Sequence, residues 1–231
     1  MQTEEFEQKR RSLVVRAASL ARTNWRVVTV SVCLAVFLFL LSEVLEGEII
    51  KIDTLAYHLF VETLRNDTLT PFMEGFSALA SPVVLVAMAL TIAAFAPGRR
   101  PGWCCAVNLV LVALLNVVIK SLVRRPRPEG IHLVVETGFS FPSGHSMAAM
   151  AFYGLIIWLI WRCEHDRRQR SLFAIAFLII IVMIGVSRIY LGVHYASDVI
   201  GGFCAALIWL ALYTRLVAPL FIEERASKVD E

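Results

Sequence analysis

Six long apolar runs, separated by short polar segments, constrain this sequence more than any other feature. Each run is long enough to cross a bilayer as a helix, which takes roughly 17–25 residues. The chain of 231 residues is 58% hydrophobic and 18% charged, whereas an ordinary soluble domain carries roughly 25% charge. A buried soluble helix could explain one such run, but not six in one small chain. The expected spans are 25–45, 70–96, 103–123, 145–161, 171–188 and 195–218.

We therefore predict an all-α fold, a bundle of six transmembrane helices. Pro82 lies within the second expected span, where it should kink the helix. The loop 46–69 contains spaced Ile and Leu residues, which indicate a short interfacial helix lying on the membrane. The predicted organisation is a basic arm over 1–24, one six-span domain over 25–218, and a tail over 219–231.

The basic residues indicate which way the chain crosses the membrane. Lys and Arg gather in four segments that fall on one side of a six-span protein, and the positive-inside rule places that side in the cytoplasm. Both termini are then cytoplasmic in a multi-pass protein of the cell membrane. A nucleic-acid partner is not expected, because these residues follow membrane sidedness and form no basic domain. The four segments contain Lys9, Arg10, Arg11, Arg16, Arg22 and Arg26; Arg99 and Arg100; Arg162, Arg167, Arg168 and Arg170; and Arg215, Arg225 and Lys228.

Nothing in the sequence indicates a metal or another cofactor. The cysteines are odd in number and match no zinc spacing, so we interpret them as small apolar packing residues. The acidic cluster of Glu43, Glu46 and Glu48 could bind a metal, but we expect it to face water. The sequence gives no oligomeric state. The five cysteines are Cys33, Cys104, Cys105, Cys163 and Cys204.

One polar stretch between two apolar runs carries a histidine and an aspartate four residues apart, His194 and Asp198. If a helix begins near His194, the two side chains share a face and can touch. A carboxylate against one imidazole nitrogen fixes the tautomer and leaves the other nitrogen free to attack or to move a proton. This pair therefore suits a nucleophile or a base.

The same threading brings three cations to the outer membrane face. The third span exits outward at Lys120 and Arg127, and the fifth exits outward at Arg188. Cations at a membrane boundary need partners or a purpose. Three that converge favour phosphate over a carboxylate as the bound anion.

The fourth span opens on that face with Ser143, Gly144 and His145. Free N–H groups at a helix N-terminus favour an anion, and the glycine lets the backbone approach it closely. Ser143 can cap the helix or donate to a phosphate oxygen. His145 has no obvious acidic neighbour in its motif and suits a general acid.

Simpler interpretations apply to several nearby residues. Arg124 and Arg125 are expected to be snorkelling side chains at a helix end. His58, His132 and His165 have no supporting pattern and are expected at the surface.

Taken together, these residues resemble the type 2 phosphatidic acid phosphatase superfamily, which includes membrane lipid phosphatases, glucose-6-phosphatase and vanadium haloperoxidases. Its signature has three parts: K-x6-R-P, P-S-G-H and S-R-x5-H-x3-D. All three match at every fixed position and in order, and the resemblance covers residues 25–218. The matches are Lys120 with Arg127-Pro128; Pro142, Ser143, Gly144 and His145; and Ser187-Arg188 with His194 and Asp198.

The resemblance implies a role for each matched residue. His194 is similar to the nucleophile that forms a phosphohistidine, Asp198 to the residue that orients it, and His145 to the acid that protonates the leaving oxygen. The family works without a metal. The phosphate binders it implies are Lys120, Arg127, Ser143, Gly144 and Arg188.

The expected function is therefore an integral membrane lipid phosphatase with its active site on the extracytoplasmic side. Its substrate would be undecaprenyl diphosphate, phosphatidylglycerophosphate or phosphatidate, among which the sequence does not choose. A lipid phosphotransferase with the same site remains an alternative. An anion channel or transporter is a weaker one, because the charges cluster at one face and none lies mid-span. Haloperoxidase relatives share the anion pocket but are soluble.

Overall fold

The computed structural model describes residues 24–96, 100–163 and 166–222. Over these residues every regular element is helical and no strand is present, which confirms the all-α prediction. The basic arm up to residue 23, the tail from residue 223 and His165 lie outside the described residues. The predicted division into arm, domain and tail stays a prediction.

Five helices are long and apolar enough to cross a membrane, and a bent pair gives up to six. The pair is α4 and α5, which meet at an angle of 51°. The chain is therefore a multi-pass membrane protein, with five or six of the expected spans. The elements are α2 (Trp25–Leu45), α3 (Lys51–Tyr57), the π-helical turn η1 (His58–Thr63), α4 (Thr70–Ala78), α5 (Pro82–Phe95), α6 (Arg100–Val123), α7 (Gly144–Cys163), α8 (Arg167–Tyr190), α9 (Ala196–Leu216) and the 3₁₀ turn η2 (Ala218–Leu220).

The second expected span is broken at the predicted proline. Pro82 begins α5, where its missing N–H costs nothing, and Ser81 caps that helix by accepting from the Val84 amide at 3.4 Å. The carbonyl of Leu79 in the break accepts a hydrogen bond from the Tyr153 hydroxyl at 2.8 Å. Because a neighbouring helix satisfies the freed backbone, the break can persist inside an apolar bundle.

Helix α7 lies at the centre of the bundle, packed against α6, α8 and α9. Its inward side chains Phe152, Tyr153 and Leu155 are fully buried, and Ile184 of α8 meets them in the main core cluster. Apolar side chains also cover the outside of the bundle, as expected where lipid replaces water. Outward-facing examples are Val83, Leu90, Phe95, Val117, Leu122, Leu172 and Leu216.

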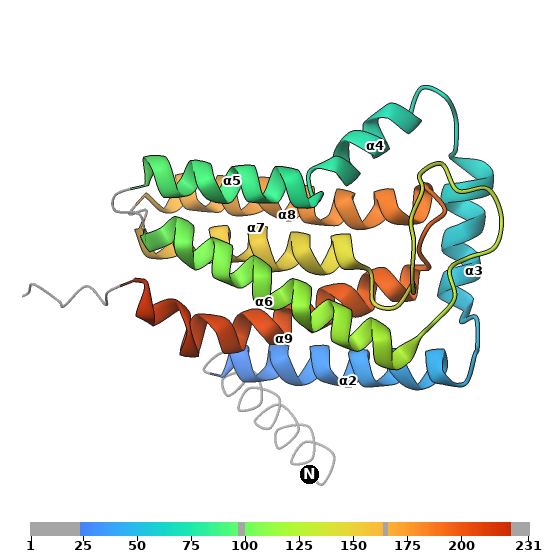
Figure 1. Cartoon of the computed structure of the whole chain (residues 1–231), viewed down its shortest axis with the longest axis horizontal. Coiled ribbons are helices and arrows are strands. Elements are labelled where there is room, and N and C mark those ends of the chain that lie inside the picture. The colour runs from blue at the N-terminus through green and yellow to red at the C-terminus, as the bar shows by residue number, and fades with distance from the viewer. Residues whose placement is uncertain (1–23, 97–99, 164–165, 223–231) are drawn as a thin grey trace, which may run out of the picture.

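One end of the bundle carries the predicted site residues. The helix formed by α3 and η1 lies across this end, beside the loop 124–143 that joins α6 to α7 (Figure 1). The last turns of α6 and α8 and the first turns of α7 and α9 meet there. We call this the site end. A helix is therefore present in the loop 46–69, while its depth in a membrane stays a prediction.

Candidate active site

The short connection between α8 and α9 places His194 next to Asp198. Gly192 makes the turn at φ +80°, a conformation that favours glycine. Tyr195 is the N-cap of α9, and Asp198 accepts a hydrogen bond from its backbone amide at 2.9 Å. His194 Nδ1 lies 3.3 Å from Asp198 Oδ2. The expected contact is present, but it comes from a helix cap, because His194 precedes α9 instead of lying within it.

Asp198 is held on both carboxylate oxygens. Oδ2 accepts from the Ser140 hydroxyl at 2.5 Å, and Oδ1 accepts from Arg125 Nη1 at 2.7 Å. The carboxylate is fully buried. A carboxylate with this many donors is fixed in both position and charge.

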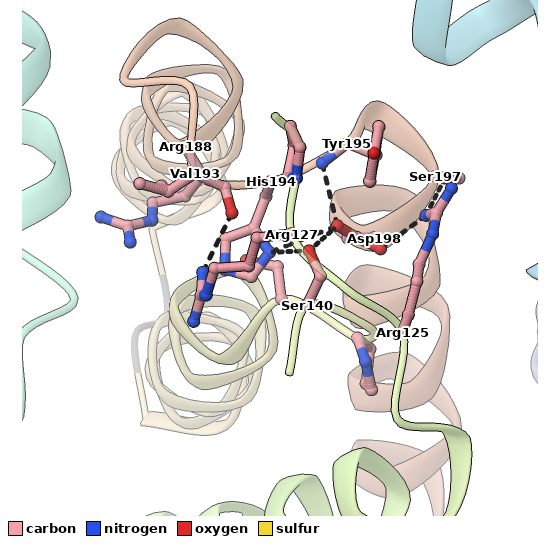
Figure 2. Close-up of polar contacts among 12 residues, drawn as sticks. Arg125, Arg127, Ser140, Arg188, Val193, His194, Tyr195, Ser197 and Asp198 are labelled. Carbon is pink, nitrogen blue, oxygen red and sulfur yellow. Dashed lines mark hydrogen bonds and ion pairs between the residues drawn. The ribbon is translucent and has the colours of Figure 1, made fainter. Parts of the chain in front are cut away.

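His194 is held neutral and aimed at an arginine (Figure 2). Burial lowers the pKa of His194 to about 4, while the Asp198 contact acts in the opposite direction. A neutral imidazole that donates a hydrogen bond from Nδ1 to Asp198 has its lone pair on Nε2. That Nε2 lies 3.3 Å from Nη1 of Arg127. The nitrogen able to attack therefore faces the cations.

The three predicted cations come from separate elements and interact electrostatically with one another. Arg127 donates to Val193 O from Nη1 at 2.9 Å, and its other nitrogens bond carbonyls of the loop 124–143. Arg188, at the end of α8, donates to the Ser77 hydroxyl at 2.5 Å, and its Nε is buried without a partner among the described residues. Lys120, in the last turn of α6, donates to Phe139 O at 2.8 Å and interacts electrostatically with Arg127.

The start of α7 is fixed from both sides. The Ser143 amide donates a hydrogen bond to Asp198 O at 2.9 Å, and the Ser143 hydroxyl accepts one from the Ser146 hydroxyl at 3.0 Å. That arrangement leaves the Ser143 proton for another acceptor. A side chain on Gly144 would come within 3.2 Å of Asn116 Oδ1, so the glycine permits a close helix contact. His145 follows within the first turn of α7.

A carboxylate that the sequence did not single out, Glu136, lies among the cations. It forms a short hydrogen bond with Arg188 Nη2, and it lies 3.5 Å from Arg127 Nη2 and 3.8 Å from His145 Nδ1. Burial would raise the pKa of this carboxyl, but Arg188, His145 and Arg127 together hold it below its ordinary value. His145 therefore has an acidic neighbour, which comes from outside its own motif. A lone Glu in a loop offers no local signal of this contact.

The snorkelling prediction is wrong for Arg125. Its guanidinium is buried, bonded to Asp53 Oδ2 at 3.0 Å as well as to Asp198, and lies 4.0 Å above the Tyr195 ring. The sequence could not reveal this, because Asp53 comes from α3, in another loop. Arg124 is exposed, as expected.

A cavity of about 570 Å³ adjoins the site. Helix α3 and the first residues of the loop 124–143 line it, including Tyr57, Arg127 and Glu129. Across the described residues, no group of three or more His, Cys, Asp or Glu side chains is arranged to hold a metal ion. The predicted independence from metal stays a prediction.

Comparisons with known proteins agree on one family. The profile of the PAP2 superfamily matches residues 101–221. Phosphatidylglycerophosphatase B of Bacillus subtilis is 35% identical over 149 residues, covering 63% of this chain and 73% of the relative. Lipid A 1-phosphatase of Rhizobium johnstonii is 30% identical over 120 residues, covering 48% of this chain and 45% of the relative. The crystal structure of a transmembrane PAP2 type phosphatidylglycerolphosphate phosphatase from Bacillus subtilis superimposes with a TM-score of 0.70 at 29% identity, covering 79% of this chain and 94% of that one.

Proposed function

The chain belongs to the PAP2 superfamily, whose members similar to it are membrane phosphatases of lipids, and from that membership we propose that it hydrolyses a lipid phosphate or diphosphate through His194. One observation carries the proposal. Asp198 contacts Nδ1 of His194, while Nε2 points at Arg127 among the cations. This arrangement suits a nucleophile aimed at a bound phosphate.

The substrate phosphate would take the place of the Glu136 carboxylate. That carboxylate lies between Arg188 and Arg127, which supports an anion site at this position. Phosphate accepts more hydrogen bonds than a carboxylate, so it can also use Lys120 and the Ser143 hydroxyl. The N-terminus of α7 adds favourable partial charge.

The reaction would then proceed in two displacements. Nε2 of His194 attacks phosphorus, the N–P bond forms, and the bond from phosphorus to the lipid oxygen breaks as His145 gives that oxygen a proton. A water molecule next attacks phosphorus, gives a proton to His145, and the N–P bond breaks. Inorganic phosphate leaves, and both histidines return to their starting states.

The cations would supply the charge stabilisation that Mg²⁺ gives in other phosphoryl transfers. We therefore expect activity to survive strong chelation. Vanadate should inhibit, because it can adopt the five-coordinate geometry of a phosphoryl group under attack. Loss of activity in EDTA that Mg²⁺ restores would contradict this site model.

Phosphatidylglycerophosphate is the first substrate to test. Phosphatidylglycerophosphatase B is the name of the relative that is 35% identical, and the cavity beside Arg127 offers room for a polar headgroup. Undecaprenyl diphosphate and phosphatidate remain in the panel. Below the site the bundle is filled by Phe152, Leu155 and Ile184, which argues against an anion path through it.

The decisive experiment is a phosphate-release assay on purified protein in detergent, with each lipid in turn. His194→Ala should abolish release while the protein stays folded and inserted. His58→Ala is the matched control, since that histidine lies exposed on η1 and should leave activity unchanged. Substantial release by folded His194→Ala protein would overturn the proposal. Adding an acceptor lipid and analysing products separates hydrolysis from phosphoryl transfer to another lipid.

We place the site on the extracytoplasmic side of the cell membrane because of the basic-residue asymmetry. Cysteine labelling tests this. A single cysteine in the loop 129–141 of a cysteine-free variant should react with an impermeant maleimide added to intact cells, and one near Arg167 should not. The reverse pattern would overturn the topology.

A further inference from the structure

A second charged network lies behind Asp198, on the side away from Arg127 and Arg188 (Figure 2). Arg125 reaches it from the loop 124–143 and donates from Nη1 to Asp198 Oδ1 at 2.7 Å and to the Ser197 hydroxyl at 2.7 Å. Its Nη2 donates to Asp53 Oδ2 at 3.0 Å. The guanidinium therefore bridges two carboxylates.

Asp53 joins α3 to the first turn of α9. Its Oδ1 accepts from the Ser197 amide at 2.8 Å, and its Oδ2 accepts from the Ser197 hydroxyl at 2.7 Å. The Asp53 side chain is fully buried although the helix that carries it lies at the site end. A carboxylate this deep needs partners for both oxygens, and here it has them.

The charges in this network do not cancel. Asp53 and Asp198 contribute two negative charges and Arg125 one positive charge, so a single negative charge remains. Of the two carboxylates, Asp198 is the one that contacts His194. In a buried site with little water, that remaining charge strongly affects a neighbouring imidazole.

We propose that Asp53 and Arg125 are positioning residues for the reaction: they hold Asp198 against His194, and Arg125 offsets the charge of Asp53 so that the network keeps a single negative charge. The inference rests on the proposed function, because it takes His194 as the nucleophile. It adds two residues that lie outside the three signature motifs. It also gives α3 a role, since that helix supplies Asp53.

The charge balance predicts opposite effects for the two residues. Arg125→Gln leaves two negative charges, favours the cationic form of His194 and raises its pKa. Asp53→Asn leaves no net charge and lowers that pKa. The double variant restores one negative charge and should return the pKa towards the wild-type value. Other charged groups that face His194 are Arg127 from the loop, Arg188 from α8 and His145 from α7, and all three stay unchanged.

The experiment measures kcat/KM against pH for the wild type, both single variants and the double variant, with the lipid phosphate released fastest in the panel. The acidic limb should move up by about one pH unit in Arg125→Gln and down by a similar amount in Asp53→Asn. The substrate also titrates near pH 6, but equally in every variant, so the differences report the enzyme.

Arg65→Gln is the matched control. Arg65 also ties the outer loop to the site end, through Tyr190 O at 2.6 Å and Ile131 O at 3.0 Å, but it contacts neither carboxylate. It should lower stability without moving the limb. If Arg125→Gln does not fold, the Asp53→Asn and double variants still decide the question, because only the charge model separates them.

If the acidic limbs of the pH profiles coincide in all folded variants, the inference is overturned and the proposed function stays intact. Shifts of the same sign in both single variants would also overturn it. Failure of the proposed function is a different result, namely phosphate release by folded His194→Ala protein.

Discussion

His194 lies between two arginine–carboxylate networks that differ in their access to water. On one side the side chains of Asp53, Arg125 and Asp198 are 0%, 6% and 0% exposed. On the other side Arg188 and Arg127 surround Glu136, whose side chain is 24% exposed. We call these the closed and the open network.

From this difference we infer that the closed network is a scaffold and that the open network is an anion-binding site. In the closed network each carboxylate oxygen has a donor within the protein, so exchange for another anion would leave buried charges unpaired. In the open network the anion comes from a loop and reaches water, and Arg188 Nε has no partner among the described residues. We therefore expect that a phosphate can replace the Glu136 carboxylate while the fold stays intact.

The largest expected effect comes from breaking the closed network. Asp53→Ala takes the acceptor from Arg125 Nη2 and from the Ser197 amide and hydroxyl. Each buried donor left without an acceptor costs about 1–3 kcal/mol of stability. Unfolding in detergent, followed by helical signal, measures this. Asp67→Ala is the control, because that carboxylate is exposed in the same outer loop. Equal stabilities of the two variants would show that the closed network is no scaffold.

Breaking the open network should act on catalysis first. Arg188→Gln removes a guanidinium that we propose binds the substrate phosphate. This substitution should lower kcat/KM by about 10²–10³-fold. Its stability loss should be smaller than that of Asp53→Ala, because the half-exposed loop lets Glu136 turn to water. Kinetics and unfolding of the same preparation test both parts, with exposed Arg124→Gln as control. A stability loss equal to that of Asp53→Ala would erase the distinction between the networks.

Removing the carboxylate from the open network should strengthen anion binding. Glu136→Gln takes away a competitor, so vanadate should inhibit about tenfold more tightly, equivalent to about 1.4 kcal/mol. Cations hold the pKa of Glu136 below its ordinary value, so the carboxylate is charged throughout the neutral pH range. The difference from the wild type should therefore persist from pH 5 to pH 8. Weaker inhibition of the variant would instead make Glu136 part of the anion site.

The sequence could predict those features of the molecule that depend on residues close together in the chain. Spans follow from apolar runs, and Pro82 marks the break between α4 and α5. His194 and Asp198 lie four residues apart, so the sequence predicts their contact, although a helix cap and not a shared helix face brings them together. The signature motifs indicated the remaining cations through resemblance, although nothing in the sequence alone showed how their side chains pair.

The rest depends on contacts between distant segments. Arg125 meets Asp53 across 72 residues, and Arg188 meets Glu136 across 52 and Ser77 across 111. In the sequence, a charged residue near a helix end looks the same whether its side chain faces water or a buried partner. Only the packing of α3 and the loop 124–143 on the site end decides between them.

The smallest expected effect concerns Ser143, which contacts the closed network and which we propose binds the phosphate. The Ser143 amide donates to Asp198 O, and the Ser143 hydroxyl accepts from the Ser146 hydroxyl, so its own proton can be donated to a phosphate oxygen. Gly202 of α9 lies directly beneath it: a Cβ there would come 2.9 Å from Ser143 O and 3.3 Å from the Ser146 Cβ. Small residues at such positions let helices approach closely.

Gly202→Ala should therefore push the start of α7 away by a few tenths of an ångström. A displacement of that size is expected to lower kcat about threefold to tenfold, because a shift of about 1 Å can cost about 10²-fold. Gly75→Ala in α4 is the matched control, since a Cβ there meets nothing within 4 Å. Steady-state kinetics at saturating substrate compare the two. Equal kcat values would mean that catalysis tolerates movement of α7 at Ser143. The position of the open network would then not depend on the closed network.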